Sequence, residues 1–138
     1  MDKVTIEWAN DEKTVVLCTY LQDGWTWEDS FKALDAQRAL IETSDAPIVD
    51  VIIDTRKTNW MPRGGSIISG IRKINSSRHP RQGQTIVVGA RGILATMANV
   101  MIKMIDSRRR EFQFVRTMEE AYSVIANLNA ERQRETTS

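Results

Sequence analysis

Residues 47–70, PIVDVIIDTRKTNWMPRGGSIISG, decide the predicted fold because they hold a strand, a loop and a helix start in succession. The β-branched run over residues 47–54 is typical of a buried strand. A cation-rich loop follows it, and the Gly pair then opens a segment that predicts a helix over residues 64–80, broken before Pro80. A strand followed by a crossover helix predicts that the next strand pairs with it in parallel.

The hydrophobic periodicity predicts the remaining elements on either side of this stretch. Thr26 is the expected N-cap of the first helix, and Thr117 with Glu120 fits a capping box at the start of the last one. The other predicted elements are strands over residues 4–9, 14–21, 84–90 and 112–115 and a helix over residues 91–110. The predicted order is β-β-α-β-α-β-α-β-α: an α/β fold with a mixed central sheet of about five strands and four helices.

Size and composition indicate one soluble domain. The chain has 138 residues, with 41% hydrophobic and 27% charged residues, which is ordinary for a globular protein. The apolar stretches are shorter than the roughly 20 residues that a membrane span requires, and the N-terminus has no signal-peptide pattern. We therefore predict a cytoplasmic protein with a single domain over residues 1–130 and a polar, frayed tail over residues 131–138.

The charges are unevenly distributed along the chain. Residues 1–50 hold 4 Lys/Arg and 11 Asp/Glu, a net charge of −7, whereas residues 51–91 hold 8 Lys/Arg and 1 Asp, a net charge of +7. Opposed surface patches would favour an acidic partner, an anionic ligand or self-association into a homodimer. The alternative is that the two segments mix in space and cancel.

The order of elements resembles that of the STAS domain, named after sulphate transporters and anti-sigma-factor antagonists. VDVIIDTRKTNWMPRGGSIISGIRKI (49–74) is similar to the strand, loop and helix of that family, and TIVVGARGILATMANVMIKM (85–104) to the segment after it. More narrowly, the chain resembles the stand-alone bacterial STAS-like members, and the resemblance covers the chain to about residue 128. It implies a STAS-like sandwich and a regulatory, protein-binding function.

In antagonist members of that family, a partner kinase phosphorylates a Ser at the start of the helix after the strand. Asp54 matches the acid at the strand end. The family's Asp-Ser-Ser-Gly pattern falls on residues 62–65 here, and this chain has neither the acid nor the Ser at those places. Ser66 lies one position beyond. It is interpreted as a helix N-cap, with phosphorylation as the alternative.

The same loop predicts a binding site at one edge of the sheet. The carboxyl ends of parallel strands meet at a common edge, where α/β folds usually bind ligands, and helix N-termini there favour anions. Trp60 would add an apolar surface. The predicted ligand- or partner-binding residues are Arg56, Lys57, Trp60, Arg63, Ser66, Arg91 and Arg116.

Groups suited to catalysis or metal binding are few. His79 is the only His and is predicted to be exposed, while Cys18 is predicted to be a buried, inert thiol. One His and one Cys cannot build a zinc site of the usual types. Asp50 and Asp54, spaced i and i+4 on one strand, share a face. They are interpreted as a carboxylate pair or as solvated strand ends. We predict a non-enzymatic protein without metal or cofactor.

The sequence does not favour a dinucleotide or nucleic-acid site. GARG (89–92) lacks the full glycine pattern of a dinucleotide site, and a sequence pI of about 7.9 does not favour nucleic acid. The Met-rich segment 91–110 is apolar over much of its circumference, which predicts core packing, with an acyl-chain pocket beneath this helix as the alternative. The first functional hypothesis is a protein-interaction domain acting through residues 55–66. The second is a carrier or sensor of an anionic small molecule or lipid.

Overall fold

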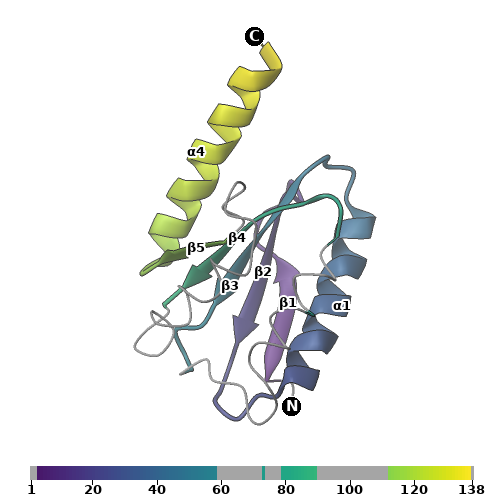
Figure 1. Ribbon diagram of the computed structural model, residues 1–138, viewed down its shortest axis with the longest axis vertical. Helices are drawn as coiled ribbons and strands as arrows, with labels where there is room; N and C mark the ends of the chain where they lie inside the picture. The colour runs from purple at the N-terminus through teal and green to yellow at the C-terminus, as the bar shows by residue number, and fades with distance from the viewer. Residues whose placement is uncertain (1–2, 59–72, 74–78, 90–111, 138) are drawn as a thin grey trace.

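The computed structural model describes residues 3–58, 73, 79–89 and 112–137, which form a mixed five-stranded sheet with a helix on each face (Figure 1). The sheet order is β1-β2-β3-β4-β5. β1 and β2 are antiparallel, and the pairs from β2 to β5 are parallel. The strands are β1 (Val4–Trp8), β2 (Val15–Tyr20), β3 (Val49–Asp54), β4 (Gln82–Val88) and β5 (Phe112–Val115).

This sheet confirms the predicted α/β class and the mixed pairing of its strands. The helices predicted over residues 64–80 and 91–110 lie outside the described residues, apart from Lys73, which is helical. The two described helices are α1 (Trp27–Thr43) and α4 (Met118–Thr137). In the described part of the chain, no helix is both long enough and apolar enough to span a membrane.

The two helices cover opposite faces of the sheet. Successive strand residues point to alternate faces, and each face carries apolar side chains that a helix buries. On one face, Val49 and Val51 are fully buried with Ile41 of α1. On the other face, Ile52 packs in a cluster with Ala121 and Ile125 of α4. In Figure 1, α1 lies along β1, and the C-terminal half of α4 extends past the end of the sheet.

Both described helices begin where the sequence predicts. The Thr26 hydroxyl accepts from the Asp29 N–H at 3.2 Å, and the Asp29 carboxylate accepts from the Thr26 N–H at 2.8 Å, so α1 starts with a complete capping box. At α4, the Thr117 hydroxyl accepts from the Glu120 N–H at 3.1 Å. The Glu120 carboxylate reaches the N–H of Arg116 at 3.3 Å, one residue before the predicted partner.

The end of the chain differs from the prediction. The segment predicted to be a frayed polar tail is helical, because α4 continues to Thr137. Arg132, in this segment, is part-buried and bonds to the Asp50 side chain. A tertiary contact therefore holds turns of helix that have little apolar surface of their own.

Asp50 lies beside a β-bulge in β4. The register passes from Val49–Gln82 to Val51–Thr85, which leaves Gly83 and Gln84 opposite Asp50. The Asp50 carboxylate accepts the Gln84 N–H at 2.8 Å. A side chain at Gly83 would collide with Asp50 and would come within 2.9 Å of Arg132. The glycine is required by this close approach.

Candidate functional site

Three neighbouring strand ends are tied together at the carboxyl edge of the sheet. Thr55, directly after β3, donates to the Val88 carbonyl from its N–H at 3.0 Å and from its hydroxyl at 2.7 Å. The N–H of Gly89, directly after β4, donates to the carbonyl of Val115 at 3.0 Å. The residues that follow these strands therefore start from fixed positions.

Asp54 and Arg56 form the central contact of this edge. The Oδ1 atom of Asp54 accepts from the backbone N–H of Arg56 at 3.0 Å and from its Nε at 2.9 Å. The Oδ2 atom accepts from Nη2 at 2.9 Å. The carboxylate is buried, while the Arg56 side chain is 49% exposed. One carboxylate thus sets both the turn of the backbone and the direction of the guanidinium.

Gly89 makes room for this arrangement. It has a φ of +85°, a conformation that L side chains rarely adopt. A Cβ atom there would lie 2.6 Å from Cγ and 3.2 Å from Cα of Arg56. The start of the 55–66 segment therefore packs directly on the turn that follows β4.

The Asp54–Arg56 pair also fixes the protonation of both groups. Burial raises the pKa of Asp54, but the hydrogen bonds and charge of Arg56, aided by the charge of Lys57, outweigh it and hold that pKa below its usual value. The hydrogen bond to Asp54 raises the pKa of Arg56. Asp54 is consequently an ionised partner for arginine near neutral pH, and its oxygens are occupied by arginine donors.

Three of the seven predicted site residues are described, and all three lie at the carboxyl edge. Arg56 is held by Asp54, Lys57 is exposed beside it, and Arg116 is exposed just after β5. The remaining predicted site residues, which lie outside the described residues, are Trp60, Arg63, Ser66 and Arg91. The prediction missed the ion pair of Arg56, although the spacing of Asp54 and Arg56 could have indicated it.

An aromatic cluster lies near the end of β2 and the start of α1. The ring centroids of Tyr20 and Trp25 are 4.8 Å apart and those of Trp25 and Trp27 are 5.9 Å apart, both edge-on. Trp27 stacks on Phe31 at 6.1 Å, and the Lys73 ammonium lies 4.1 Å from the centre of the Phe31 ring. Because β2 is parallel to β3, this cluster belongs to the same edge as Asp54.

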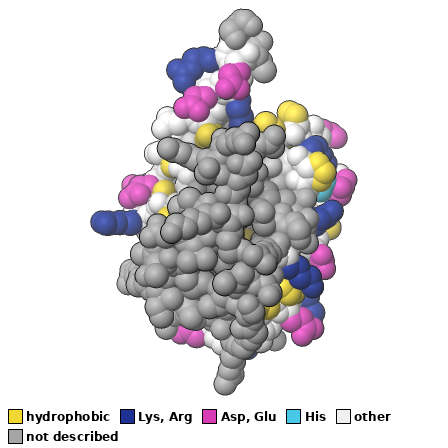
Figure 2. Space-filling view, viewed as in Figure 1, with side chains coloured by type: hydrophobic (Ala, Val, Ile, Leu, Met, Phe, Trp, Pro, Cys, Tyr) yellow, Lys and Arg dark blue, Asp and Glu magenta, His cyan; other side chains and the backbone are white. Residues whose placement is uncertain are grey.

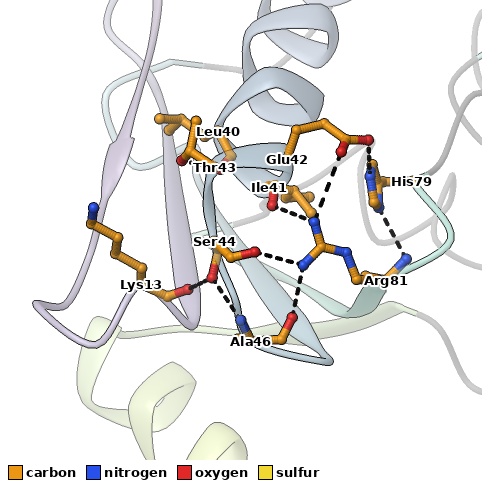
Figure 3. Close-up of polar contacts among 9 residues, drawn as sticks. All are labelled: Lys13, Leu40, Ile41, Glu42, Thr43, Ser44, Ala46, His79 and Arg81. Carbon is orange, nitrogen blue, oxygen red and sulfur yellow. Dashed lines mark hydrogen bonds and ion pairs between the residues drawn. The ribbon is translucent and has the colours of Figure 1, made fainter.

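His79 lies at the opposite edge, and the prediction that it is exposed was wrong. It is 6% exposed, and its Nε2 lies 2.6 Å from Oε1 of Glu42 (Figure 3). Its Nδ1 accepts the N–H of Arg81 at 3.0 Å, so Nε2 carries the proton that Glu42 accepts. The hydrogen bond from His79 lowers the pKa of Glu42. With both ring nitrogens engaged, this pair suits a structural role.

Arg81 closes the C-terminal end of α1 in the same cluster. Its Nη1 donates to the carbonyls of Ser44 at 2.7 Å and Ala46 at 2.9 Å, and its Nη2 donates to that of Ile41 at 2.8 Å. Figure 3 shows the guanidinium pointing into this set of oxygens. A cation from the 51–91 segment thus contacts the acidic N-terminal segment, which supports the mixing of charges at this place.

The described residues offer few other groups for metal binding or thiol chemistry. Among the described residues, no cluster of three or more His, Cys, Asp or Glu side chains could hold a metal ion. Cys18 is buried as predicted, and burial raises the pKa of its thiol to about 12. In the view of Figure 2, described acidic and basic side chains alternate along the side where α1 lies.

Comparisons with known proteins give no family for this chain. No protein-family model matches it, and no curated protein matches it in sequence. A search of solved structures finds the crystal structure of Sfh5 at a TM-score of 0.47 and 12% identity, over 81% of this chain. The chain spans 46% of the length of that protein.

Proposed function

We propose that the protein is a non-enzymatic regulatory domain of STAS-like type that binds a protein partner through residues 55–66 and the helix predicted after them. The observation that carries this proposal is the anchoring of Arg56 by Asp54. Two bonds hold the guanidinium and one holds the backbone N–H. The first residues of the segment are therefore preorganised, which lowers the entropy lost on binding.

The chemistry of the edge favours a partner with an acidic surface. Lys57 and Arg116 are exposed, and about half of the Arg56 side chain is exposed although its charge is compensated by Asp54. Exposed charges of this kind steer association and select partners more than they add affinity. Lys57 and Arg116 should therefore steer and select an acidic partner, with Arg56 acting as a positioned hydrogen-bond donor.

A binding role is also favoured over catalysis by the state of the described acids and bases. A general base needs an oxygen or nitrogen that can take a proton at the working pH. Asp54 has a lowered pKa and is bonded to Arg56, and His79 is held between Glu42 and the Arg81 N–H. These groups support the architecture of the sheet edges.

The test uses charge reversals that leave the Asp54–Arg56 pair intact. The unchanged protein and the Lys57→Glu/Arg116→Glu variant are each crosslinked to their partners in the host and purified, and the co-purified proteins are quantified. We expect the variant to lose a partner that the unchanged protein retains. Lys13→Asp is the control for a charge reversal outside this edge, because Lys13 is exposed at the opposite end of the sheet and its φ of 57° suits Asp. Recovery of every partner equally with all three proteins would refute the proposal.

The second candidate function is a carrier or sensor of an anionic small molecule or lipid. The observation in its favour is that Arg56 and Lys57 follow directly from the carboxyl edge of a parallel sheet. A ligand present at 100 times its Kd stabilises a protein by about 2.7 kcal/mol. We expect thermal unfolding to shift with inorganic phosphate, a nucleotide or a fatty acid, and the shift to be lost in Lys57→Glu. Unchanged unfolding with all three would exclude this function.

Native mass spectrometry of protein purified gently from its host separates the two functions. A non-covalent mass excess that is lost on denaturation would favour the carrier. A covalent excess of about 80 daltons, corresponding to one phosphate, would support regulation by phosphorylation, with Ser66 as the first residue to substitute. Protein at the sequence mass would favour the partner-binding domain.

A further inference from the structure

Arg56 uses one edge of its guanidinium to bind Asp54. Its Nε donates to Oδ1 at 2.9 Å, and its Nη2 donates to Oδ2 at 2.9 Å. A guanidinium carries one N–H on Nε and a pair of N–H groups on each terminal nitrogen. The contact with Asp54 therefore leaves both N–H groups of Nη1 and one of Nη2 without a partner among the described residues.

The Arg56 side chain is held at its stem as well as at its head. A Cβ atom on Gly89 would lie 2.6 Å from Cγ of Arg56, so the stem passes directly over the Gly89 backbone. The Asp54 side chain is 8% exposed, and it covers the Nε–Nη2 edge. The 49% exposed fraction of the Arg56 side chain therefore falls mainly on the opposite end, where Nη1 lies.

The unused donors form a second forked edge. One N–H of Nη1 and one of Nη2 are parallel in a planar guanidinium, and their spacing matches the two oxygens of a carboxylate. Asp54 accepts from the neighbouring edge and so fixes the plane of the group. The second edge therefore points in one direction before a partner arrives, which lowers the side-chain entropy lost on binding.

We infer that this Nη1–Nη2 edge of Arg56 binds the carboxylate of an Asp or Glu side chain on the protein partner, through two parallel hydrogen bonds. The inference rests on the proposed function and adds to it the chemical group that the site recognises. Arg56 then joins two carboxylates, that of Asp54 within the chain and one that belongs to the partner.

The charge of the site suits a carboxylate better than a phosphate. Asp54 neutralises Arg56, and Lys57, which is exposed and next in the chain, adds a cation. These three groups together leave a single positive charge, which one carboxylate balances. A phosphate group carries close to two negative charges at neutral pH, and like-charge repulsion from Asp54 would oppose the excess.

Nuclear magnetic resonance of the full chain tests the edge directly. The probe is the capped peptide Gly-Glu-Glu-Glu-Gly, and the uncharged Gly-Gln-Gln-Gln-Gly is its control. We expect the Glu peptide alone to shift the Nε–Hε signal of Arg56. Arg56→Lys should raise the Kd of the Glu peptide about five- to tenfold, because lysine keeps the charge but has no planar fork.

Arg134→Lys is the matched control, because it makes the same change in side chain away from the carboxyl edge. Arg134 is exposed on α4, two positions after Arg132, which bonds to Asp50 near the start of β3. We expect this variant to bind the Glu peptide with an unchanged Kd.

Asp54→Asn separates orientation from charge. The substitution removes a negative charge beside Arg56, so attraction by charge alone predicts tighter binding of the Glu peptide. Orientation predicts the reverse, because the amide NH2 of asparagine cannot accept from Nη2. We expect the Kd to rise about threefold. Circular dichroism checks that the variant is folded, and if it is not, Arg56→Lys and the Arg56 signal still decide.

Four results would overturn the inference. Equal affinity of the unchanged protein and Arg56→Lys, or tighter binding by Asp54→Asn, would show that charge alone attracts the peptide. Binding of inorganic phosphate but not of the Glu peptide would assign the edge to a small anion, and binding of neither would leave the fork without a ligand. The crosslinking test reverses Lys57 and Arg116 and keeps Arg56, so the proposed function can stand where this inference fails.

Discussion

Arg132 and Asp50 lie 82 positions apart in the chain and form a two-bond ion pair, with Nη1 2.8 Å from Oδ2 and Nη2 2.9 Å from Oδ1. The Asp50 carboxylate is buried, and the hydrogen bond to it raises the pKa of Arg132. The pair joins α4 to β3 beside the bulge in β4. Asp50 and Asp54, on the same face of β3, thus each bind an arginine, Arg132 and Arg56 respectively.

Loss of Arg132 should destabilise the protein strongly. Removing one partner of a buried pair typically costs about 3 to 5 kcal/mol, because the other charge remains buried. Arg132 is partly exposed and Gln84 still donates to Asp50, so we expect about 2 to 3 kcal/mol for Arg132→Ala in urea unfolding. Glu131→Ala, on the exposed side of α4, is the control. An equal effect of both substitutions would show that the ion pair does not hold α4.

Asp54 should make stability depend on pH in the acidic range. Its folded-state pKa is lowered, so its contribution is complete above the unfolded value of about 4 and is lost as pH falls through the folded value. The stability difference between the unchanged protein and Asp54→Asn should therefore be constant near neutral pH and should shrink below about pH 4. Denaturant unfolding at several pH values measures it, with Asp11→Asn as the exposed control. A difference that grows on acidification would contradict this assignment.

Arg81 should stabilise the C-terminal end of α1. That helix has no basic residue in its last turn. Arg81 supplies a cation and three hydrogen bonds, to the carbonyls of Ile41 in the last turn, the C-cap Ser44 and Ala46 just beyond it. We expect Arg81→Ala to lower the free energy of unfolding by about 2 kcal/mol and Arg81→Lys to restore part of it. Arg116→Ala serves as the exposed control. An unchanged free energy of unfolding in Arg81→Ala would mean that water satisfies these carbonyls as well as the guanidinium does.

Cys18 should be unreactive in the folded protein. The thiolate is the nucleophile, and burial raises the pKa of this thiol to about 12. We expect negligible reaction with a thiol reagent at pH 8 under native conditions, and one thiol per chain after unfolding in urea. The reaction rate should follow the unfolded fraction as urea is increased. Rapid labelling of the native protein would show that Cys18 is accessible.

The features predicted correctly depend on local sequence. The β-branched run that ends in Asp54 alternates between two buried faces, and Thr26 with Asp29 forms a cap from residues three positions apart. The hydrophobic period of a strand and the capping pattern of a helix involve only residues close in the chain, so both can be predicted without knowing the fold. The parallel pairing of β3 with β4 follows from the rule for crossover connections.

The features that were missed depend on contacts between distant residues. His79 looks exposed in the sequence because it lies next to Pro80 between two arginines, yet it is buried against Glu42, 37 positions earlier. Arg132 looks like part of a solvated tail, yet its two hydrogen bonds to Asp50 hold it against the sheet. Hydrophobic periodicity cannot predict these two ion pairs, because the partners are far apart in the chain and belong to no common local pattern.

Local sequence thus predicted the strands, the starts of α1 and α4, the buried thiol and the sheet edge at which Arg56 and Lys57 lie. Which partners the charged side chains bind came only from tertiary packing. Arg56 is bound to Asp54, Arg81 holds the end of α1, and Asp50 fixes α4. The physical reason is that backbone preferences act over a few residues, whereas the partner of a buried charge is chosen by which side chains the packed sheet brings within about 3 Å.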